Sequence, residues 1–250
     1  MTMDIWKYYE VTHKEHLICN PIGSEKLDEL IHLLKLSSQS RVLEIATGKA
    51  EFLIRLVEKY NMSAIGIDLS PYHLAEAKKK GKERVPEADL TLIEMDGANY
   101  QPDTSEGFEL TCCLGASWIY EGHEGTLKYL MRHTKHNGFI VVGEPFWISK
   151  PPEEYFDLSE VKYEMFSTHY GNVQIGEKLG LNLLYTFVST QDEWDRYFGL
   201  QWYAADKYAQ TSPDDPDLPE ILAKLNQEKL LYLKWERDTI GWAIYVFRKK

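Results

Sequence analysis

Hydrophobic positions in the first 143 residues alternate between two patterns. Short apolar runs typical of strands buried on both faces of a sheet occur at 41–46, 64–68, 90–94, 108–114 and 139–143. Between them, apolar side chains recur at helical spacing in 22–36, 52–60, 70–84 and 126–133. Ser70-Pro71 is a typical helix start, and 136–138 predict a turn. This alternation predicts an α/β fold in which a mostly parallel sheet carries helices on both faces.

The pattern changes after residue 149. Residues 150–170 are rich in proline and acidic side chains and predict an excursion over the sheet edge, followed by a helical pattern at 171–179. Residues 181–189 and 242–248 are strand-like, which brings the predicted sheet to seven strands. Helical stretches fill 191–238, a segment too long for a simple connector. We expect this segment to form a helical lid over the carboxyl ends of the strands.

Charge and cysteine content narrow the class of protein. The chain has 39 Asp and Glu against 28 Lys and Arg, a net charge of −11 at pH 7. Nucleic-acid binding needs a basic surface, so this balance argues against a DNA or RNA partner. No apolar run approaches the roughly 20 residues of a membrane span, and the N-terminus lacks the apolar core of a signal peptide. Three cysteines, two of them vicinal in a predicted strand, favour a reducing cytoplasm over secretion.

Small and acidic residues follow the first three predicted strands. Ligands of such sheets bind beyond the carboxyl ends of the strands, so these positions are the candidates for chemistry. Residues 44–50 make a tight turn of small residues that runs into a helix N-terminus with free N–H groups. Asp68 ends the second strand, where a carboxylate can accept ribose hydroxyls, and Asp96 ends the third, where it can meet an adenine amino group. The three together indicate an adenosine-containing cofactor; the alternative is that both acids only cap loops or helices.

These positions resemble the successive motifs of class I S-adenosylmethionine (SAM)-dependent methyltransferases. The motifs are VLEIATG (42–48), GIDLS (66–70), MDG (95–97) and NGFIVV (137–142). Further pieces are similar to a narrower bacterial group of uncharacterised small-molecule methyltransferases: LGASW (114–118), GEPFW (143–147), DEWDRY (192–197) and GW (241–242). The resemblance implies a Rossmann-like sheet, SAM as the cofactor and S-adenosylhomocysteine (SAH) as its product.

The resemblance also implies which residues contact the cofactor and how the chain is organised. The implied cofactor residues are Glu44, Ala46, Thr47, Gly48, Asp68, Leu69, Met95, Asp96, Gly97 and Leu114. The chain is expected to be a single methyltransferase domain, 1–250. Its expected parts are a segment over the cofactor (1–21), a SAM-binding core (22–149), cap insertions (150–170 and 191–238) and a final strand (239–250).

The turn after the first strand departs from the family pattern. The family usually places three alternating glycines there, whereas this chain keeps only Gly48, with Ala46 and Ala50 at the other two positions. Alanine fits without strain where φ is negative and costs on the order of 1 kcal/mol where φ must be positive. The G-x-G-x-x-G turn of dinucleotide-binding dehydrogenases is absent as well.

Aromatic and acidic residues after the fourth and fifth strands are the candidates for the acceptor side. Glu144 is a candidate base or a binder of a cationic substrate, and the alternative is a strand-end ion pair. The candidate pocket walls are Trp118, Tyr120 and Trp147, with Trp194, Tyr197 and Trp202 from the lid. Aromatic residues at such positions are as often core, and the aromatic content of 13% does not choose between the two.

The sequence therefore predicts a SAM-dependent methyltransferase (EC 2.1.1.-) that acts on an unidentified small molecule by in-line displacement. Such a reaction needs mainly positioning and exclusion of water. Two alternatives stay open: a non-catalytic relative that binds SAM or SAH as a sensor or scaffold, and another nucleoside-cofactor enzyme such as a nicotinamide oxidoreductase. No metal is predicted, because His13, His16 and Cys19 lack the fourth ligand of a structural zinc site. His123 is expected to be exposed to solvent.

Overall fold

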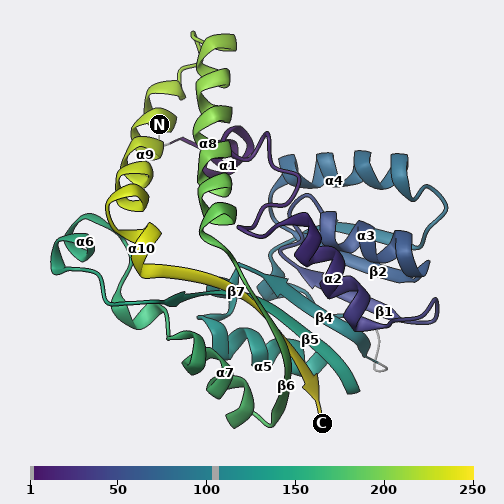
Figure 1. The fold of residues 1–250 in the computed structure, drawn as a ribbon. Helices are drawn as coiled ribbons and strands as arrows, with labels where there is room; N and C mark the ends of the chain where they lie inside the picture. The colour runs from purple at the N-terminus through teal and green to yellow at the C-terminus, as the bar shows by residue number, and fades with distance from the viewer. Residues whose placement is uncertain (1–2, 103–106) are drawn as a thin grey trace.

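The structure, a computed structural model, describes residues 3–102 and 107–250. It contains a seven-stranded sheet with the order β3-β2-β1-β4-β5-β7-β6 (Figure 1). The strands are β1 (Arg41–Ile45), β2 (Ser63–Asp68), β3 (Leu90–Glu94), β4 (Phe108–Leu114), β5 (Thr134–Trp147), β6 (Leu181–Val188) and β7 (Ile240–Lys249). β1 to β5 pair in parallel, and β7 runs antiparallel to its neighbours β5 and β6. The predicted seven-stranded, mostly parallel sheet is confirmed.

Helices cover both faces of this sheet, as the alternating pattern predicts (Figure 1). On one face lie α2 (Ser24–Leu34), α3 (Glu51–Tyr60) and α4 (Pro71–Arg84), and on the other lie α5 (His123–His133) and α7 (His169–Lys178). Successive strand residues point to opposite faces, so Val42 packs in the first buried core cluster and Leu43 in the second. Ser70 caps α4 by accepting a hydrogen bond from the His73 amide, which confirms the predicted helix start.

Two regions differ from the sequence-based expectations. The first twenty residues contain a helix, α1 (Ile5–Thr12), which Asp4 caps through the Trp6 amide. β5 begins at Thr134 rather than at residue 139, and the turn predicted at 136–138 is an irregularity inside this strand. Asn137 absorbs that irregularity with a φ of 63°, a conformation that asparagine tolerates better than most residues.

The remaining helices come from the segments after β5 and between β6 and β7. They are α6 (Glu153–Leu158), η3 (Tyr163–Met165), α8 (Gln191–Thr211), α9 (Leu218–Leu231), the π-helical turn η4 (Tyr232–Glu236) and α10 (Arg237–Thr239). α8 and α9 stand beside each other, with α1 against α8 (Figure 1). Tyr8 and Val11 of α1 share a buried cluster with Ala205 of α8 and Ile221 of α9. We call α8, α9, η4 and α10, together with α6 and η3, the cap.

Some predicted segments extend beyond the part that is described. Residues 1 and 2 of the predicted N-terminal segment, and 103–106 of the predicted SAM-binding core, lie outside the described residues. Within the described ranges, no helix combines the length and the apolar character needed to cross a membrane.

Candidate functional site

A pocket of about 550 Å³ lies at the carboxyl edge of the sheet, where the strand order reverses between β1 and β4. Its lining includes residues at the ends of four strands: Ala46, Gly48, Asp68, Leu69, Met95, Asp96, Gly97, Leu114, Gly115 and Ala116. The N-terminal segment contributes His13 and Asn20, and α8 contributes Tyr197. Cofactor and small-molecule sites usually have volumes of roughly 300–1,000 Å³, and the switch point of a doubly wound sheet is where they form. We call this space the strand-end pocket.

The turn after β1 has three residues in the left-handed conformation. Ala46, Gly48 and Ala50 have φ values of 55°, 55° and 54°. Two alanines therefore occupy positions that favour glycine, at a cost of about 1 kcal/mol each. A side-chain Cβ at position 48 would meet only Cys19, 3.9 Å away, among the described residues. The backbone there is open for a ligand to approach.

Asp68 connects this turn to the end of β2. Its Oδ2 accepts a hydrogen bond from the Gly48 amide at 2.6 Å, and its Oδ1 accepts one from the Ser70 amide at 2.8 Å. The carboxylate is buried yet lines the strand-end pocket. Each carboxylate oxygen has a second lone pair, so these two hydrogen bonds leave acceptor capacity for ligand hydroxyls. Asp68 thus both caps the loop and faces the pocket. The capping role that the sequence left open as an alternative is therefore compatible with ligand binding by the same carboxylate.

The end of β3 is arranged in the same way. Asp96 accepts a hydrogen bond from the Ala98 amide at 2.9 Å and caps the short helix η1 (Gly97–Asn99). A Cβ at Gly97 would approach the Ile45 side chain to 2.6 Å, so only glycine lets this loop pack against β1. Leu69 and Met95 lie beside these residues with 44% and 38% of their surfaces exposed. Such exposed apolar side chains suit the faces of a planar base.

Glu44 is buried beneath the turn after β1, and it does not line the strand-end pocket. Its carboxyl group accepts a hydrogen bond from the Thr47 hydroxyl. Burial raises the pKa of Glu44 to about 8, the hydrogen bond from Thr47 opposes the shift, and the charge of Asp68 adds to it. Glu44 therefore supports the shape of the turn through its hydrogen bond with Thr47.

Lys49 is a buried residue of this turn that the sequence analysis missed. Its ammonium group donates to the backbone carbonyls of His13, Lys14 and His16 at 2.9, 3.3 and 3.2 Å and pairs with Glu76 at 2.8 Å. Next to Gly48, a lysine resembles an ordinary solvent-exposed residue, so the sequence carries no signal for this role. The side chain fastens the N-terminal segment over the strand-end pocket.

Two further contacts hold the same segment in place. The Asn20 amide donates to the Leu114 carbonyl at 2.9 Å, and the Tyr197 hydroxyl lies 2.9 Å from His13 Nε2. Burial is the main cause that lowers the pKa of His13 well below its usual value, so this imidazole is neutral. The described residues contain no group of three or more His, Cys, Asp or Glu side chains that could hold a metal ion.

The aromatic candidates for the acceptor side separate into three environments. Trp118 and Tyr197 line the strand-end pocket, and Trp118 is 74% exposed at its rim. Tyr120 donates its hydroxyl to the Gly97 carbonyl at 2.8 Å and lies outside the pocket lining. The other three lie in or against the cap: Trp147, at the end of β5, is buried against Tyr155 and Trp235, Trp194 faces a smaller pocket, and Trp202 packs beside α9.

Glu144 lies in β5 on the side of the sheet that α5 and α7 cover. It is buried and accepts a hydrogen bond from the Ser117 hydroxyl at 3.0 Å. Its other oxygen is 3.8 Å from Nδ1 of His123, whose Nε2 lies 3.2 Å from the Asn172 carbonyl. The expectation that His123 is exposed is wrong, because α5 packs against the sheet and buries it. Glu144 is not part of the strand-end pocket lining; Ser117 is its neighbour on the side of β4.

Comparisons with known proteins agree with this geometry. A family model described as a methyltransferase domain matches residues 42–138. The uncharacterized protein YjhP of Escherichia coli (strain K12) is 29% identical over 97% of this chain and 98% of its own length. A solved structure of a SAM-dependent methyltransferase from Geobacter sulfurreducens in complex with SAH is 29% identical, with a TM-score of 0.91, and the match covers 100% of both chains. The corresponding protein from Thiobacillus denitrificans, also in complex with SAH, is 29% identical, with a TM-score of 0.89 over 99% of this chain and 100% of its own.

The matched domain begins in β1 and extends into β5, so it contains all the strand ends that form the pocket. Both similar methyltransferases carry SAH, an adenosine compound, which sets aside the nicotinamide alternative. The open backbone at Gly48 and the carboxylates of Asp68 and Asp96 fit such a compound. In its matched domain and in its fold, the chain is similar to SAM-dependent methyltransferases.

Proposed function

We propose that this protein transfers the methyl group of SAM to a small-molecule acceptor by in-line displacement, as an enzyme of class EC 2.1.1.-. One observation carries the proposal: strand ends, the N-terminal segment and α8 enclose a single pocket of about 550 Å³ that contains both strand-end acids. A pocket enclosed in this way suits a reaction that depends on positioning and on exclusion of water. Bound SAM supplies an activated methyl group on a sulfonium.

In this proposal the strand ends hold the cofactor. Asp68 accepts the ribose hydroxyls through lone pairs left free by its two backbone hydrogen bonds. Asp96 and Gly97 face the adenine edge, and Leu69 and Met95 pack on its faces. The turn from Ala46 to Gly48 and the end of β4 at Leu114 receive the rest of the molecule, while Glu44 and Thr47 hold the turn in shape.

The acceptor side is formed by the cap and the N-terminal segment. We assign Trp118 and Tyr197 to the acceptor because both line the strand-end pocket. Residues 1–21 and 191–238 act as a lid on a single domain, and their role is to exclude water. Glu144 is the base of this proposal where the acceptor must lose a proton; its hydrogen-bonded neighbour Ser117 directly precedes Trp118 of the pocket lining.

Calorimetric titration with SAM and with SAH tests the cofactor assignment. We expect micromolar affinity for the wild type and at least a 100-fold loss in Asp68→Ala, because the variant removes the ribose acceptor and the hydrogen bonds from the Gly48 and Ser70 amides. Asp68→Asn keeps one acceptor oxygen and should lose less. Asp89→Ala removes an exposed acid of the same charge and should bind as the wild type does. A folded Asp68→Ala with unchanged affinity contradicts the assignment.

A second candidate function is a sensor or scaffold that binds SAM or SAH without transfer. The positive φ angles of Ala46 and Ala50 favour it, because the turn that receives the cofactor is strained. The two functions separate in an acceptor screen that measures SAH formation. Release of SAH with any acceptor excludes the sensor, and tight SAM binding with no turnover across small amines, alcohols, thiols and carboxylates supports it.

A further inference from the structure

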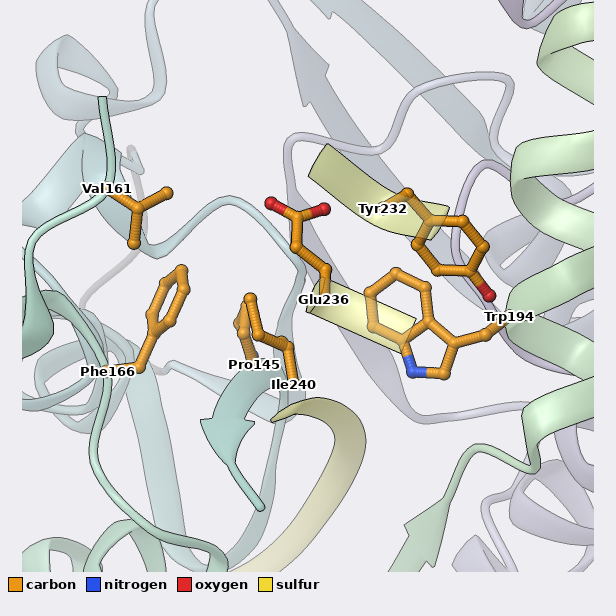
Figure 2. Close-up of a pocket in the computed structure, with 7 residues that line it drawn as sticks. All are labelled: Pro145, Val161, Phe166, Trp194, Tyr232, Glu236 and Ile240. Carbon is orange, nitrogen blue, oxygen red and sulfur yellow. The ribbon is translucent and has the colours of Figure 1, made fainter. Parts of the chain in front are cut away.

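A second pocket, which we call the cap pocket, lies within the cap (Figure 2). Its volume is about 150 Å³. It is lined by Pro145, Val161, Phe166, Trp194, Tyr232, Glu236 and Ile240. These residues come from β5, the loop after α6, α8, η4 and β7, so only the folded cap brings them together.

The two pockets are close neighbours. Gly115 lines the strand-end pocket, and its amide donates to the Gly143 carbonyl of the adjacent strand at 3.0 Å. Pro145, two residues after Gly143, lines the cap pocket. On α8, Tyr197 faces the strand-end pocket and Trp194 the cap pocket, and their ring centroids are 6.3 Å apart. A ligand group bound in the cap pocket is therefore separated from the strand-end pocket by the step from β5 to β4 and by one turn of α8.

Glu236 is the acidic member of an otherwise uncharged lining. The Tyr155 hydroxyl donates to its Oε1 at 2.9 Å, and within 3–102 and 107–250 its Oε2 has no hydrogen bond or ion pair. The nearby cations are bound elsewhere, Lys234 to Glu154 at 2.9 Å and Arg237 to Asp195 at 2.8 Å. Burial raises the pKa of Glu236 to about 7, as expected for a carboxyl in apolar surroundings without a cation.

Aromatic rings surround the same space. In the view of Figure 2, the six-membered ring of Trp194 lies toward Glu236 and its indole nitrogen points away, so the pocket presents the ring rather than the donor. Tyr232 and Phe166 complete the aromatic wall. Aromatic π-systems attract cations, and a carboxylate among rings is a typical site for an ammonium group. A cavity of ~150 Å³ admits a group about the size of benzene.

We propose that the cap pocket recognises one end of the acceptor, and that this end is an organic amine, protonated when it binds, on an apolar body of about six heavy atoms, while the atom that receives the methyl group lies in the strand-end pocket beside Trp118 and Tyr197. Glu236 receives the ammonium group, and Trp194, Tyr232 and Phe166 surround the apolar body. The inference that the bound amine is a methyl acceptor rests on the proposed methyl transfer, whereas binding of the amine is measured without turnover. Glu236 is a specificity residue here, because recognition of the charge is its contribution.

Calorimetric titration of the full-length protein saturated with SAH tests the inference. The probes are cyclopentylamine and the uncharged cyclopentanol, which match in size. We expect the wild type to prefer the amine by at least tenfold and Glu236→Gln to lose that preference while its affinity for the alcohol stays within threefold. Glu164→Gln removes the same charge from an exposed position of the neighbouring loop and should behave as the wild type does.

A second variant keeps the proposal testable if Glu236→Gln does not fold. Val161→Phe fills the cap pocket from the loop side and keeps the carboxyl group of Glu236, and it should weaken both probes by at least tenfold. Equal affinity for amine and alcohol in the wild type, no detectable amine binding, or an unchanged amine preference in Glu236→Gln overturns the amine site. Failure of SAH to bind in the first step overturns the proposed function instead, so the two failures are distinguishable.

Discussion

The two pockets of this protein are formed by different kinds of interaction. The strand-end pocket is organised by backbone hydrogen bonds at the ends of parallel strands, such as those from Gly48 and Ser70 to Asp68. The cap pocket is made of side chains from five separate segments, most of them aromatic or aliphatic, with Glu236 as its acid. The first is proposed to bind the cofactor and the second to select the acceptor. In this proposal, cofactor binding and acceptor choice lie on different elements of one fold.

The difference also predicts how each pocket responds to substitution. Backbone hydrogen bonds in the strand-end pocket depend on a few buried charges, so single substitutions there should have large effects on stability. The cap depends on dispersed ring contacts and on partly exposed ion pairs, whose loss has a smaller effect. Four substitutions test this contrast.

Lys49→Met should destabilise the protein by about 3 kcal/mol, because it withdraws a buried ammonium from three backbone carbonyls and from Glu76. SAM affinity should fall as well, since the N-terminal segment closes the strand-end pocket. Urea denaturation and SAM titration measure the two effects. Lys14→Met is the matched control, because Lys14 pairs with the same Glu76 from an exposed position and should cost less than about 0.5 kcal/mol. Equal losses in the two variants would contradict the role of Lys49.

Glu44→Gln should change how stability depends on pH. The folded protein keeps the proton on Glu44 up to a pKa of about 8, while the unfolded chain releases it near 4.5, so the wild type loses stability as pH rises through this window. Relative to Glu44→Gln, the wild type should lose about 2 kcal/mol between pH 6 and pH 8. Denaturation curves of both proteins at several pH values give this difference. The contributions of the other titrating groups cancel because both proteins contain them. Glu94→Gln, at an exposed position, should follow the wild-type profile, and a flat difference for Glu44→Gln would show that Glu44 is ionised in the folded state.

Asp195→Ala should disturb the cap and leave the strand-end pocket intact. Asp195 accepts hydrogen bonds from Arg237 at 2.8 and 2.9 Å and from the Tyr232 hydroxyl at 2.7 Å, which fixes η4 against α8. Since both charged partners are partly exposed, we expect a loss of about 1 kcal/mol. Amine binding in the cap pocket should weaken, and SAM affinity should stay within twofold. Asp206→Ala, exposed on the same helix, controls for helix propensity; a large loss of SAM binding in Asp195→Ala would mean that the two pockets are coupled.

Ala46→Gly should stabilise the protein by about 0.5 kcal/mol. Glycine removes the strain of a φ of 55°, and its greater freedom in the unfolded chain offsets part of that gain. The change in the urea midpoint reports this effect, and SAM affinity should rise or stay equal. Ala64→Gly in β2, where the backbone is extended, is the control and should be destabilising by at least about 0.5 kcal/mol. Destabilisation by Ala46→Gly would show that the methyl group of Ala46 packs more favourably than its backbone strain costs.

The hydrophobic pattern was enough to predict the seven strands, their order along the chain and the ends of the first four. The runs at β3 and β4 have the bounds that their hydrophobicity predicts, and β4, the more deeply buried of the two, is apolar along most of its length. The strand ends then meet at one edge, so Asp68 and Asp96 are brought together by topology alone. Helix α1 and the early start of β5 were missed, since their residues are mixed in polarity and are ordered by packing rather than by pattern.

Only the tertiary structure decided what the buried charges do. In the sequence Lys49, His123 and Glu236 are ordinary polar residues, yet the fold buries the first two and turns the third into a lone carboxylate beside a ring-lined pocket. It also separated the aromatic candidates, placing Trp118 at the strand-end pocket and Trp194 in the cap. The physical reason is the separation along the chain over which each effect acts. Propensity and periodicity act between neighbouring residues, whereas burial and charge pairing depend on contacts between segments that are distant in the chain.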